Sequence, residues 1–427
     1  MRVNLKTLGC RLNEAETESW GARFQSAGHN IVREIDKTDL FVINTCAVTT
    51  EATRKSRQLI RRLHRQNPNA KMVVSGCYAS LSPEEAAGIL GVDLVVRNTD
   101  KELLVDLTHK YLWPEAMPTP ATEPGEQALF KRGRQRAFIK VQDGCRYRCS
   151  FCIVTVARGP EKSRPIRDIV LQINALHSKG IKEAILTGVH LGGYGSDIGE
   201  NLNRLIRTVL EQTSIPRIRL GSLEPWELGE GFIELFQDSR LMPHLHLPLQ
   251  SGCDAVLRRM ARRCKISDFK RLVDQARDAV PDINITTDII VGFPGESDQE
   301  WLESLDNIRD IGFGHIHIFT YSPRENTKAA QMPNQIPNQI KRQRSKILHA
   351  LALDMKQETY RRFQNREFPI LWEGNPDECS AEKIFGYTPN FLRVGTDSVA
   401  DLENSIKPAK IAKIASNGDY LAGQLVD

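Results

Sequence analysis

The sequence predicts a mixed α/β protein with three parts: an N-terminal parallel α/β sheet domain, a central partial (β/α)6 barrel and a C-terminal small β-barrel. Three observations support this fold class. Short apolar runs alternate with helical patterns in residues 1–112, the alternation resumes and repeats from Ala137, and short apolar runs set off by Gly, Pro, Asn and Asp follow Phe368. Strand–helix alternation is typical of parallel sheets, and closely spaced short strands are typical of small barrels.

The N-terminal part contains three apolar runs that indicate buried strands, at Val3–Gly9, Leu40–Thr45 and Lys71–Gly76. Helical patterns occupy Ala52–Gln66 and Pro83–Ile89, between or after these runs. The alternation predicts a parallel sheet with helices packed on it.

A proline-rich segment then interrupts the pattern. YLWPEAMPTPATEPG (Tyr111–Gly125) holds four prolines and has no periodicity, which favours an interdomain linker over a long surface loop within one domain. The domain boundaries that we expect are 1–112 for the N-terminal domain, 113–130 for the linker, 131–362 for the barrel with a following basic helix, and 363–427 for the C-terminal domain.

Six apolar runs predict the strands of the central domain. They are Ala137–Gln142, Glu183–Val189, Arg217–Leu223, His244–Gln250, Ile285–Gly292 and His315–Tyr321. Helical patterns separate them, among others at Ile166–Ser178, Phe232–Gln237, Asp268–Ala279 and Gln299–Ile311. Six consecutive strand–helix units suit a curved, partly closed parallel barrel, with an open doubly wound sheet as the alternative.

A polar helix rich in lysine and arginine is expected at Lys341–Arg366, before the C-terminal strands. Hydrophobic residues make up 40% of the 427 residues and charged residues 26%, the balance of a globular protein with ample core material. No apolar run reaches the length of a membrane span, and MRVNLKTLGC lacks the apolar stretch of a signal peptide. We therefore expect a cytoplasmic protein without a membrane partner, and a monomer.

The stretch GCRYRCSFC (Gly144–Cys152) places Cys145, Cys149 and Cys152 directly after the first barrel strand. Loops at the carboxyl ends of barrel strands form the working face of such folds. A structural zinc site would need four ligands, and no histidine stands at a suitable spacing. A [4Fe–4S] cluster held by three thiolates instead leaves one iron open for a small molecule.

A second trio of cysteines lies in the N-terminal domain. Cys10, Cys46 and Cys77 each follow immediately on a predicted strand, and small residues precede them. Ligands collect at the carboxyl ends of parallel strands, so the three thiols would converge if their strands are neighbours. The alternative is three ordinary buried cysteines.

The barrel loop resembles the signature of radical S-adenosylmethionine (SAM) enzymes, which carry Cys-x3-Cys-x2-Cys with an aromatic residue, here Phe151, before the last cysteine. The resemblance implies a [4Fe–4S] cluster on Cys145, Cys149 and Cys152 that cleaves SAM to a radical on a partial (β/α)6 barrel. Residues at the ends of the barrel strands match the regions that hold SAM in that family. They are Phe151, Thr187, Gly188, Glu224, Gln250, Val291 and Phe293.

Over nearly its whole length the chain resembles the radical SAM methylthiotransferases. Matching segments include TLGCRLNEAETE, INTCAVTTEA and SGCYA in the N-terminal domain, LTGVHLGGYG, LHLPLQSG and TDIIVGFPGE in the barrel, and FGYTPNFLRV in a C-terminal TRAM domain. The resemblance implies a second [4Fe–4S] cluster on Cys10, Cys46 and Cys77, and an external electron donor. It is strongest to the subgroup acting on tRNA threonylcarbamoyladenosine. Two relatives act on isopentenyladenosine in tRNA or on an aspartate of a ribosomal protein, and Thr155 and Val156 depart from the common pattern.

The resemblance also implies the anticodon stem-loop of tRNA as partner. Candidate contacts are the basic residues Arg342, Arg344, Arg361 and Arg362 of the polar helix and the aromatic residues Tyr387 and Phe391. Such cations bind phosphate and such rings stack on unpaired bases. A solvated helix face and a packed barrel core would use the same residues. The alternative from another class is a non-catalytic RNA-binding protein whose cysteines hold a structural metal.

Overall fold

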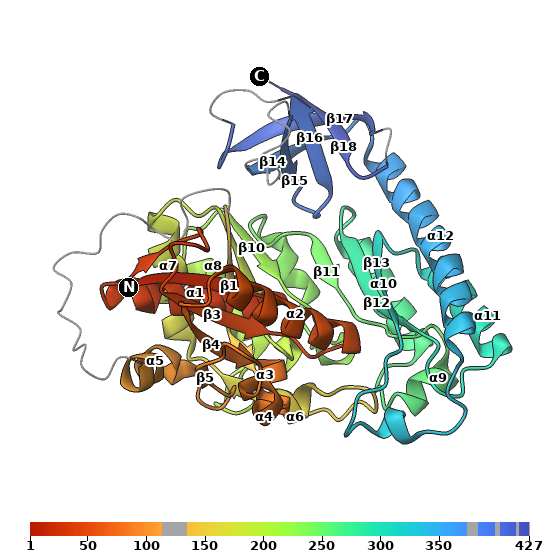
Figure 1. Ribbon diagram of the computed structural model, residues 1–427. Helices are drawn as coiled ribbons and strands as arrows, with labels where there is room; N and C mark the ends of the chain where they lie inside the picture. The colour runs from red at the N-terminus through yellow and green to blue at the C-terminus, as the bar shows by residue number, and fades with distance from the viewer. Residues whose placement is uncertain (113–134, 374–382, 398–401, 416–417, 427) are drawn as a thin grey trace.

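The computed structural model describes residues 1–112, 135–373, 383–397, 402–415 and 418–426. Figure 1 shows the N-terminal domain, in red and orange, against a barrel that runs from yellow to cyan, with a small β-barrel in blue at the C-terminal end. The predicted fold class is confirmed. The predicted linker at 113–130 lies outside the described residues, so the domain boundaries remain a proposal. No helix within the described ranges is long and apolar enough to cross a bilayer.

The N-terminal domain is built on a five-stranded sheet in the order β2-β1-β3-β4-β5, and all neighbouring strands are parallel. The strands are β1 (Arg2–Thr7), β2 (Asn30–Ile31), β3 (Leu40–Thr45), β4 (Lys71–Gly76) and β5 (Leu94–Val95). The helices are α1 (Arg11–Ser26), α2 (Thr50–Gln66), α3 (Cys77–Leu81), α4 (Pro83–Ala87) and α5 (Leu104–Leu112).

Each face of this sheet has its own core, because alternate residues of a strand point to opposite faces. Phe41 and Ile43 of β3 pack with Leu59, Ile60 and Leu63 of α2 on one face. On the other face, Leu40 and Val42 pack with Trp20 and Phe24 of α1 and with residues of α5. The apolar residues of α2 recur at helical spacing, which makes this helix predictable from sequence.

The central domain contains six parallel strands, which the chain visits in spatial order. They are β6 (Arg136–Lys140), β9 (Glu183–Thr187), β10 (Arg217–Leu220), β11 (His244–His246), β12 (Asn284–Val291) and β13 (His315–Thr320). Its helices are α6 (Val154–Arg158), α7 (Ile166–Ser178), α8 (Leu202–Gln212), α9 (Asp254–Arg259), α10 (Ile266–Ala279) and α11 (Asp298–Ile311), and a short ribbon joins β7 (Gln142–Asp143) to β8 (Lys162–Ser163).

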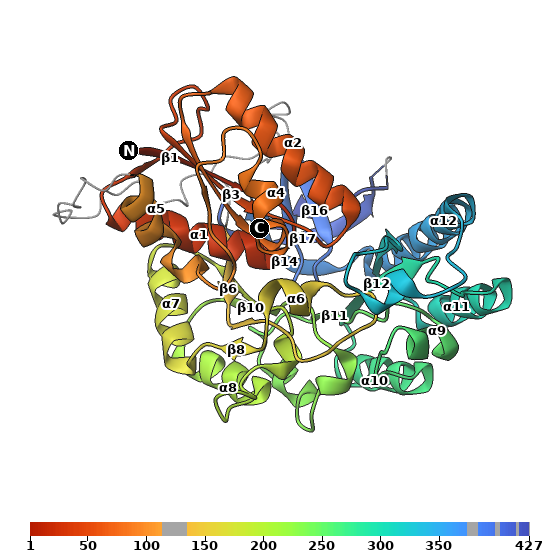
Figure 2. The same cartoon turned by 60° about the horizontal axis from the view of Figure 1, so that its bottom comes forward.

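The strands form two three-stranded sheets, β6-β9-β10 and β11-β12-β13, joined by parallel bridges such as Ser222 to His246. This sequential order makes a partial barrel and excludes the doubly wound sheet, in which the strand order reverses at a switch point. Among the described strands, β6 does not pair with β13, so the barrel is open on that side. Helix α1 of the N-terminal domain packs along β6, and Figure 2 shows that domain above the barrel.

A long helix, α12 (Asn338–Phe363), connects the barrel to the C-terminal domain. That domain is a closed barrel in the order β14-β15-β16-β18-β17. Its strands are β14 (Glu367–Glu373), β15 (Lys383–Tyr387), β16 (Arg393–Asp397), β17 (Ile406–Ile414) and β18 (Leu421–Leu425). Trp372, Val394, Ile411 and Leu421 fill its core and are fully buried.

The C-terminal barrel docks on the end of the central barrel where the strands begin. The Arg219 guanidinium pairs with the buried carboxylate of Glu183 at 2.9 Å and donates to the carbonyl oxygen of Pro389 at 3.0 Å. Arg217 donates to the carbonyl oxygen of Tyr387 at 3.1 Å. Two arginines of β10 thus hold the main chain of the C-terminal domain.

Several element boundaries differ from the expectation. Helix α1 is absent from the sequence-based prediction, because its few large apolar residues, Leu12, Trp20 and Phe24, are separated by polar ones and form no clear helical pattern. The segment expected as a helix at Phe232–Gln237 is a 3₁₀ turn at Ile233–Gln237. The strand expected at His244–Gln250 ends at His246, because Pro248 has no amide hydrogen to continue a ladder.

Candidate active site

The loop that carries Cys145, Cys149 and Cys152 follows β7, and its start is hydrogen bonded to the residues that follow α6. The amide of Cys145 donates to the carbonyl oxygen of Gly159 at 3.2 Å, and the amide of Cys152 donates to that of Cys149 at 3.0 Å. Gly144 has a φ of 72°, and a Cβ there would lie 1.9 Å from the carbonyl oxygen of Pro160. Only glycine allows this close return of the chain.

The three thiols of this loop are close enough to influence one another electrostatically. Burial raises the pKa of Cys145 to about 11 and that of Cys152 to about 12, and the other thiols of the loop add to both shifts. Thiols in such a site become thiolates when a metal replaces their protons. A trio of thiolates at the end of a barrel strand suits a [4Fe–4S] cluster with one iron left free.

An ion pair beside the loop was not anticipated from the sequence. Arg262 Nη2 lies 2.7 Å from Glu224 Oε2, and the guanidinium stands over the ring of Trp226 at 4.3 Å from its centroid. Burial raises the pKa of Cys149, whereas the charge of Arg262 lowers it. A sequence of arginines such as RRMARRC does not show which one turns inward, so the pairing becomes visible only in three dimensions.

Apart from Phe151, which lies in the cysteine loop, the residues expected to bind SAM lie at or shortly after the carboxyl ends of β9 to β12. Thr187 ends β9, Val291 ends β12, and both are buried. The rings of Phe151 and Phe293 meet edge to face at 6.5 Å. Gln250 holds a φ of 75°, and its amide donates to the carbonyl oxygen of Asp288 at 2.8 Å. Non-glycine residues with positive φ are uncommon and concentrate at functional sites.

Gly188 lies directly after β9 at a point of close chain approach. A Cβ on this residue would lie 2.9 Å from Gln142 Oε1, so a larger side chain would push into the barrel entrance. The side-chain Nε2 of Gln142 donates to the carbonyl oxygens of Asp143 and Gly144 at 2.9 and 2.8 Å. SAM binding by the residues at these strand ends remains a proposal.

The second trio lies at one edge of the N-terminal sheet. Cys10 is the N-cap of α1 after β1, Cys46 follows β3, and Cys77 begins α3 after β4. These strands are neighbours in the order β1-β3-β4, so the condition for convergence of the thiols is met. A Cβ on Gly9 would lie 2.8 Å from Cys46 Sγ, which shows how closely the backbone approaches this thiol.

The charges of these thiols also act on one another. Burial raises the pKa of Cys46 to about 11, and the thiols of Cys77 and Cys10 raise it further. Cys46 and Cys77 are buried, whereas Cys10 is exposed and leaves the trio open on one side. Three thiols of this kind fit a second iron–sulfur cluster by the same donor chemistry.

A buried cluster of charged side chains joins the N-terminal domain to the barrel beside the N-terminal trio, and no sequence pattern predicted it. Arg158 is at its centre: Nη1 bonds Glu16 Oε1 at 2.8 Å and Asp143 Oδ1 at 3.0 Å, and Nη2 bonds Asn13 Oδ1 at 2.6 Å. The Lys101 ammonium bonds Glu16 at 2.7 Å and also Asp143. Glu16, Asn13 and Lys101 belong to the N-terminal domain, and Asp143 and Arg158 flank the barrel loop.

This cluster keeps its carboxylates ionised although it excludes water. Burial alone would raise the pKa of Glu16, but Arg158 and the neighbouring lysines lower it to about 2. The pKa of Arg158 lies well above its usual value despite burial, because Glu16, Cys77 and Asp143 face it. Arg158 therefore joins the two domains and places a fixed positive charge next to the N-terminal trio.

Replacing Arg158 with methionine should destabilise the protein by about 3–5 kcal/mol, since removal of one partner leaves buried carboxylates without compensation. The midpoint of urea unfolding, followed by tryptophan fluorescence, measures the change. Trp20 is a suitable reporter because its indole Nε1 donates to the carbonyl oxygen of Lys101 at 3.1 Å.

The matched control is Arg204→Met, which removes an exposed arginine that pairs with Glu200 at 3.2 Å on α8. Exposed pairs of this kind contribute at most about 1 kcal/mol. Equal shifts of the midpoint in the two variants would contradict the bridging role of Arg158.

The geometry constrains the residues expected to contact RNA. The Arg344 side chain is 6% exposed and bonds Glu296 Oε2 and Asp298 Oδ1, both at 2.7 Å, so it has no free face for phosphate. Phe391 stacks on Tyr387 at 4.8 Å, and Arg219 lies 4.7 Å from the Phe391 ring centroid at the junction with the central barrel. Both rings are half-buried, and their stacking on RNA bases stays a prediction.

Comparison with known proteins agrees with this arrangement. A family model described as the radical SAM superfamily matches residues 139–308, and one described as "Uncharacterized protein family UPF0004" matches residues 2–97. Among solved structures, the radical SAM methyltransferase TsrM from Kitasatospora setae shares the fold, with a TM-score of 0.58 at 16% identity over 77% of each chain. The fold and the cysteine loop thus define a radical SAM enzyme.

Curated relatives match over nearly the whole chain. The threonylcarbamoyladenosine tRNA methylthiotransferase MtaB of Bacillus subtilis (strain 168) is 35% identical over 99% of this chain and 96% of its own length, and MtaB of Thermotoga maritima is 36% identical over 87% and 86%. A tRNA-2-methylthio-N(6)-dimethylallyladenosine synthase from Syntrophus aciditrophicus is 32% identical over 94% and 89%. The chain belongs to the methylthiotransferase family of radical SAM enzymes.

Proposed function

We propose that this protein transfers a methylthio group to carbon 2 of the threonylcarbamoyladenosine next to the anticodon of tRNA. The observation that carries the proposal is the presence of two cysteine trios at strand ends of two domains that Arg158 joins, in a chain similar to tRNA methylthiotransferases over nearly its full length. The threonylcarbamoyl subgroup is favoured because its members have the higher identities, although the margin over the dimethylallyladenosine subgroup is small.

Membership of the radical SAM family implies a [4Fe–4S] cluster and SAM. We assign the cluster to Cys145, Cys149 and Cys152, and a second one to Cys10, Cys46 and Cys77. When bound, these groups supply the radical that removes hydrogen from carbon 2 of adenine and the sulfur that takes its place. The protein contributes binding, orientation and the exclusion of water.

The residues around the barrel loop have distinct tasks in this proposal. The carboxylate of Glu224, held in place by Arg262, accepts hydrogen bonds from the ribose hydroxyls of SAM. Gln250, which follows β11 in its unusual backbone conformation, is also assigned to SAM. The edge-to-face pair of Phe151 and Phe293 closes the apolar side and keeps water from the radical.

Mass spectrometry of tRNA nucleosides, prepared with and without the protein, tests this function directly. We expect a methylthio derivative of threonylcarbamoyladenosine only when the protein is present. A methylthio derivative of isopentenyladenosine, or of a ribosomal-protein aspartate, would transfer the protein to another subgroup. A colourless, zinc-loaded protein that binds tRNA without changing it would favour the non-catalytic alternative, since two four-iron clusters bring roughly eight irons per chain.

The remaining candidates for phosphate contact are Arg342, Arg361 and Arg362 on α12. Arg342 is exposed and lines a shallow pocket with Arg54 and Ser322, between the N-terminal domain and the barrel. Arg361 is exposed and pairs only with Glu358 of its own helix at 3.0 Å among its described contacts. These positions lie along one helix that leads from the barrel to the C-terminal domain (Figure 1).

A triple variant, Arg342→Gln/Arg361→Gln/Arg362→Gln, should weaken tRNA binding and flatten its salt dependence. If all three contact phosphate, the slope of log K against log salt should fall in magnitude by roughly 2 to 3. Filter binding at several salt concentrations measures the slope.

The control for this experiment removes three exposed arginines on the outer helices of the barrel, Arg204, Arg271 and Arg309, which pair with carboxylates three or four residues earlier in the chain. It lowers the net charge by the same amount. If both triple variants have the slope of the unmodified protein, α12 is a solvated helix and tRNA binds elsewhere. The cytoplasmic location, the electron donor and the monomeric state remain predictions.

A further inference from the structure

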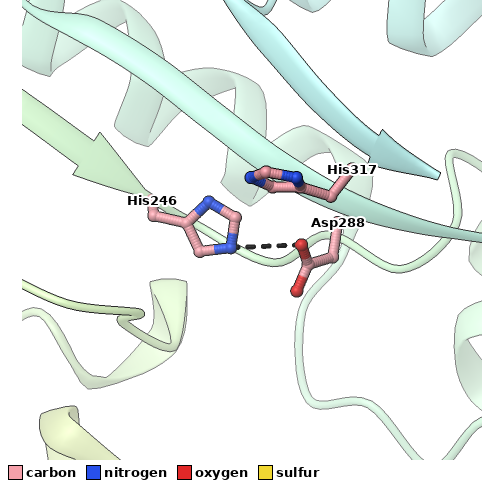
Figure 3. Close-up of side chains that lie close together, drawn as sticks. All are labelled: His246, Asp288 and His317. Carbon is pink, nitrogen blue, oxygen red and sulfur yellow. Dashed lines mark ion pairs between the residues drawn. The ribbon is translucent and has the colours of Figure 1, made fainter. Parts of the chain in front are cut away.

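A group of potential metal ligands lies inside the central barrel, apart from both cysteine trios. His246 ends β11, Asp288 lies in the middle of β12, and His317 lies in β13, where it is the register partner of Asp288. Figure 3 shows the three side chains turned toward one another from three adjacent strands. One ligand atom of each lies within 4.8 Å of the other two. Among the described residues, no other group of three or more His, Cys, Asp or Glu side chains has its ligand atoms this close together.

We propose that His246, Asp288 and His317 bind one divalent transition-metal ion. Two imidazoles and one carboxylate are a frequent set of protein ligands for Zn²⁺ and related ions when a further position is left for water or a substrate atom. The proposal needs no covalent step and does not depend on the tRNA substrate proposed above.

The first support is the way in which His246 is held. The Thr286 hydroxyl lies 2.9 Å from its Nδ1 and fixes the ring, while Nε2 points to Asp288 Oδ1 at 3.2 Å. The same hydroxyl lies 3.1 Å from Nε2 of the buried His244. Metal-binding histidines commonly have their second nitrogen fixed by an outer partner in this manner.

The second support is the position of His317. Its exposed ring stands 5.5 Å from that of His246 at an interplanar angle of 65°, so it borders the pair formed by His246 and Asp288. None of the hydrogen bonds identified among the described residues involves the His317 ring. An ordinary ion pair between His246 and Asp288 would not require a third ligand beside it.

The charge around the site limits its strength. Two imidazoles bound through their lone pairs, one carboxylate and a divalent ion sum to one positive charge, and within the described residues no second carboxylate joins the group. We therefore expect weaker binding than at a structural zinc site, and an oxygen ligand, water or an anion, in the open position.

Equilibrium dialysis of the anaerobically prepared, cluster-loaded protein against Zn²⁺ tests the site, with iron and zinc measured on the same sample. We expect one zinc per chain in addition to the full iron content. His317→Ala and Asp288→Ala should each weaken binding by about a hundredfold or more, since loss of an outer partner alone typically costs about 10–100-fold. His349→Ala, at an exposed histidine of α12, should bind zinc as the unmodified protein does.

Zinc can also occupy cysteines that lack iron, so a second probe is needed. Mn²⁺ prefers carboxylate and imidazole ligands to thiolates, and its free ion is quantified by its electron paramagnetic resonance signal. The same two variants should lose Mn²⁺ binding. The proposal is overturned if iron-replete protein binds neither ion, or if the bound ion is unaffected by His317→Ala and Asp288→Ala.

Discussion

Replacing any one of Cys145, Cys149 and Cys152 with alanine is expected to abolish reductive cleavage of SAM. Each thiol lies in the same short loop, and the cluster that we assign there would lose one of its three protein ligands. Anaerobic incubation with SAM and a chemical reductant, followed by chromatography of 5′-deoxyadenosine, measures the reaction. We expect no product above the level seen without protein.

Cys253→Ala is the control for these three variants. Cys253 is buried directly before α9 of the same barrel and lies outside the cysteine loop. Its thiol donates to Glu303 Oε2 at 3.3 Å. It should retain iron and form 5′-deoxyadenosine at the unmodified rate. Undiminished 5′-deoxyadenosine in any of the three loop variants would refute the assignment of the cluster.

The second large effect concerns the division of labour between the trios. A Cys10→Ala/Cys46→Ala/Cys77→Ala variant should retain roughly half the iron, because one of two four-iron clusters is lost. It should still form 5′-deoxyadenosine, since the barrel loop is intact. It should yield no methylthio product, because the site that we assign to the sulfur is gone. Iron analysis, 5′-deoxyadenosine and tRNA nucleosides are measured on one preparation.

Ordinary buried cysteines would behave differently. Their replacement would cost on the order of 1–3 kcal/mol each and leave iron and product near the unmodified levels. Cys264→Ala, at another buried cysteine, gives that reference. Retained 5′-deoxyadenosine formation shows that the triple variant is folded, so a loss of product alone is interpretable. Methylthiolated tRNA from the triple variant would eliminate the two-cluster mechanism.

Both trios were predictable because their information is local. In each case a cysteine directly follows an apolar run, and the carboxyl ends of parallel strands share one edge. The pattern could not provide the strand order. A doubly wound sheet therefore remained an alternative to the partial barrel. The bridge from Ser222 to His246 and the sequential order of β6 to β13 resolve that choice.

The Arg158 cluster could not be predicted, for a physical reason. Glu16 and Arg158 are 142 positions apart, and nothing in either segment shows that a carboxylate and a guanidinium will be buried together. Burial of paired charges depends on how two domains meet, and this is not encoded in spacing or periodicity.

For the basic helix α12, we expected more free cations than the structure has. The resemblance, together with the run of cations, led us to expect its arginines to contact RNA, but Arg344 and Lys341 are turned toward the barrel and buried. Lys341 Nζ donates to the carbonyl oxygen of Tyr321 at 3.1 Å. A run of cations gives the number of charges on a helix, whereas the packing of neighbouring elements determines which of them remain free.

The docking of the C-terminal barrel has a consequence for the evolution of the protein. Arg217 and Arg219 grip carbonyl oxygens of Tyr387 and Pro389, and every amino acid supplies a carbonyl oxygen. Mutations on the C-terminal side of this seam can therefore accumulate without erasing the acceptors, provided that the local backbone path is kept. The arginines of β10 cannot be replaced as easily, because the buried carboxylate of Glu183 would then lose its charge partner. The sequence of the C-terminal domain can thus change gradually in evolution, while the barrel keeps the two arginines that bind it.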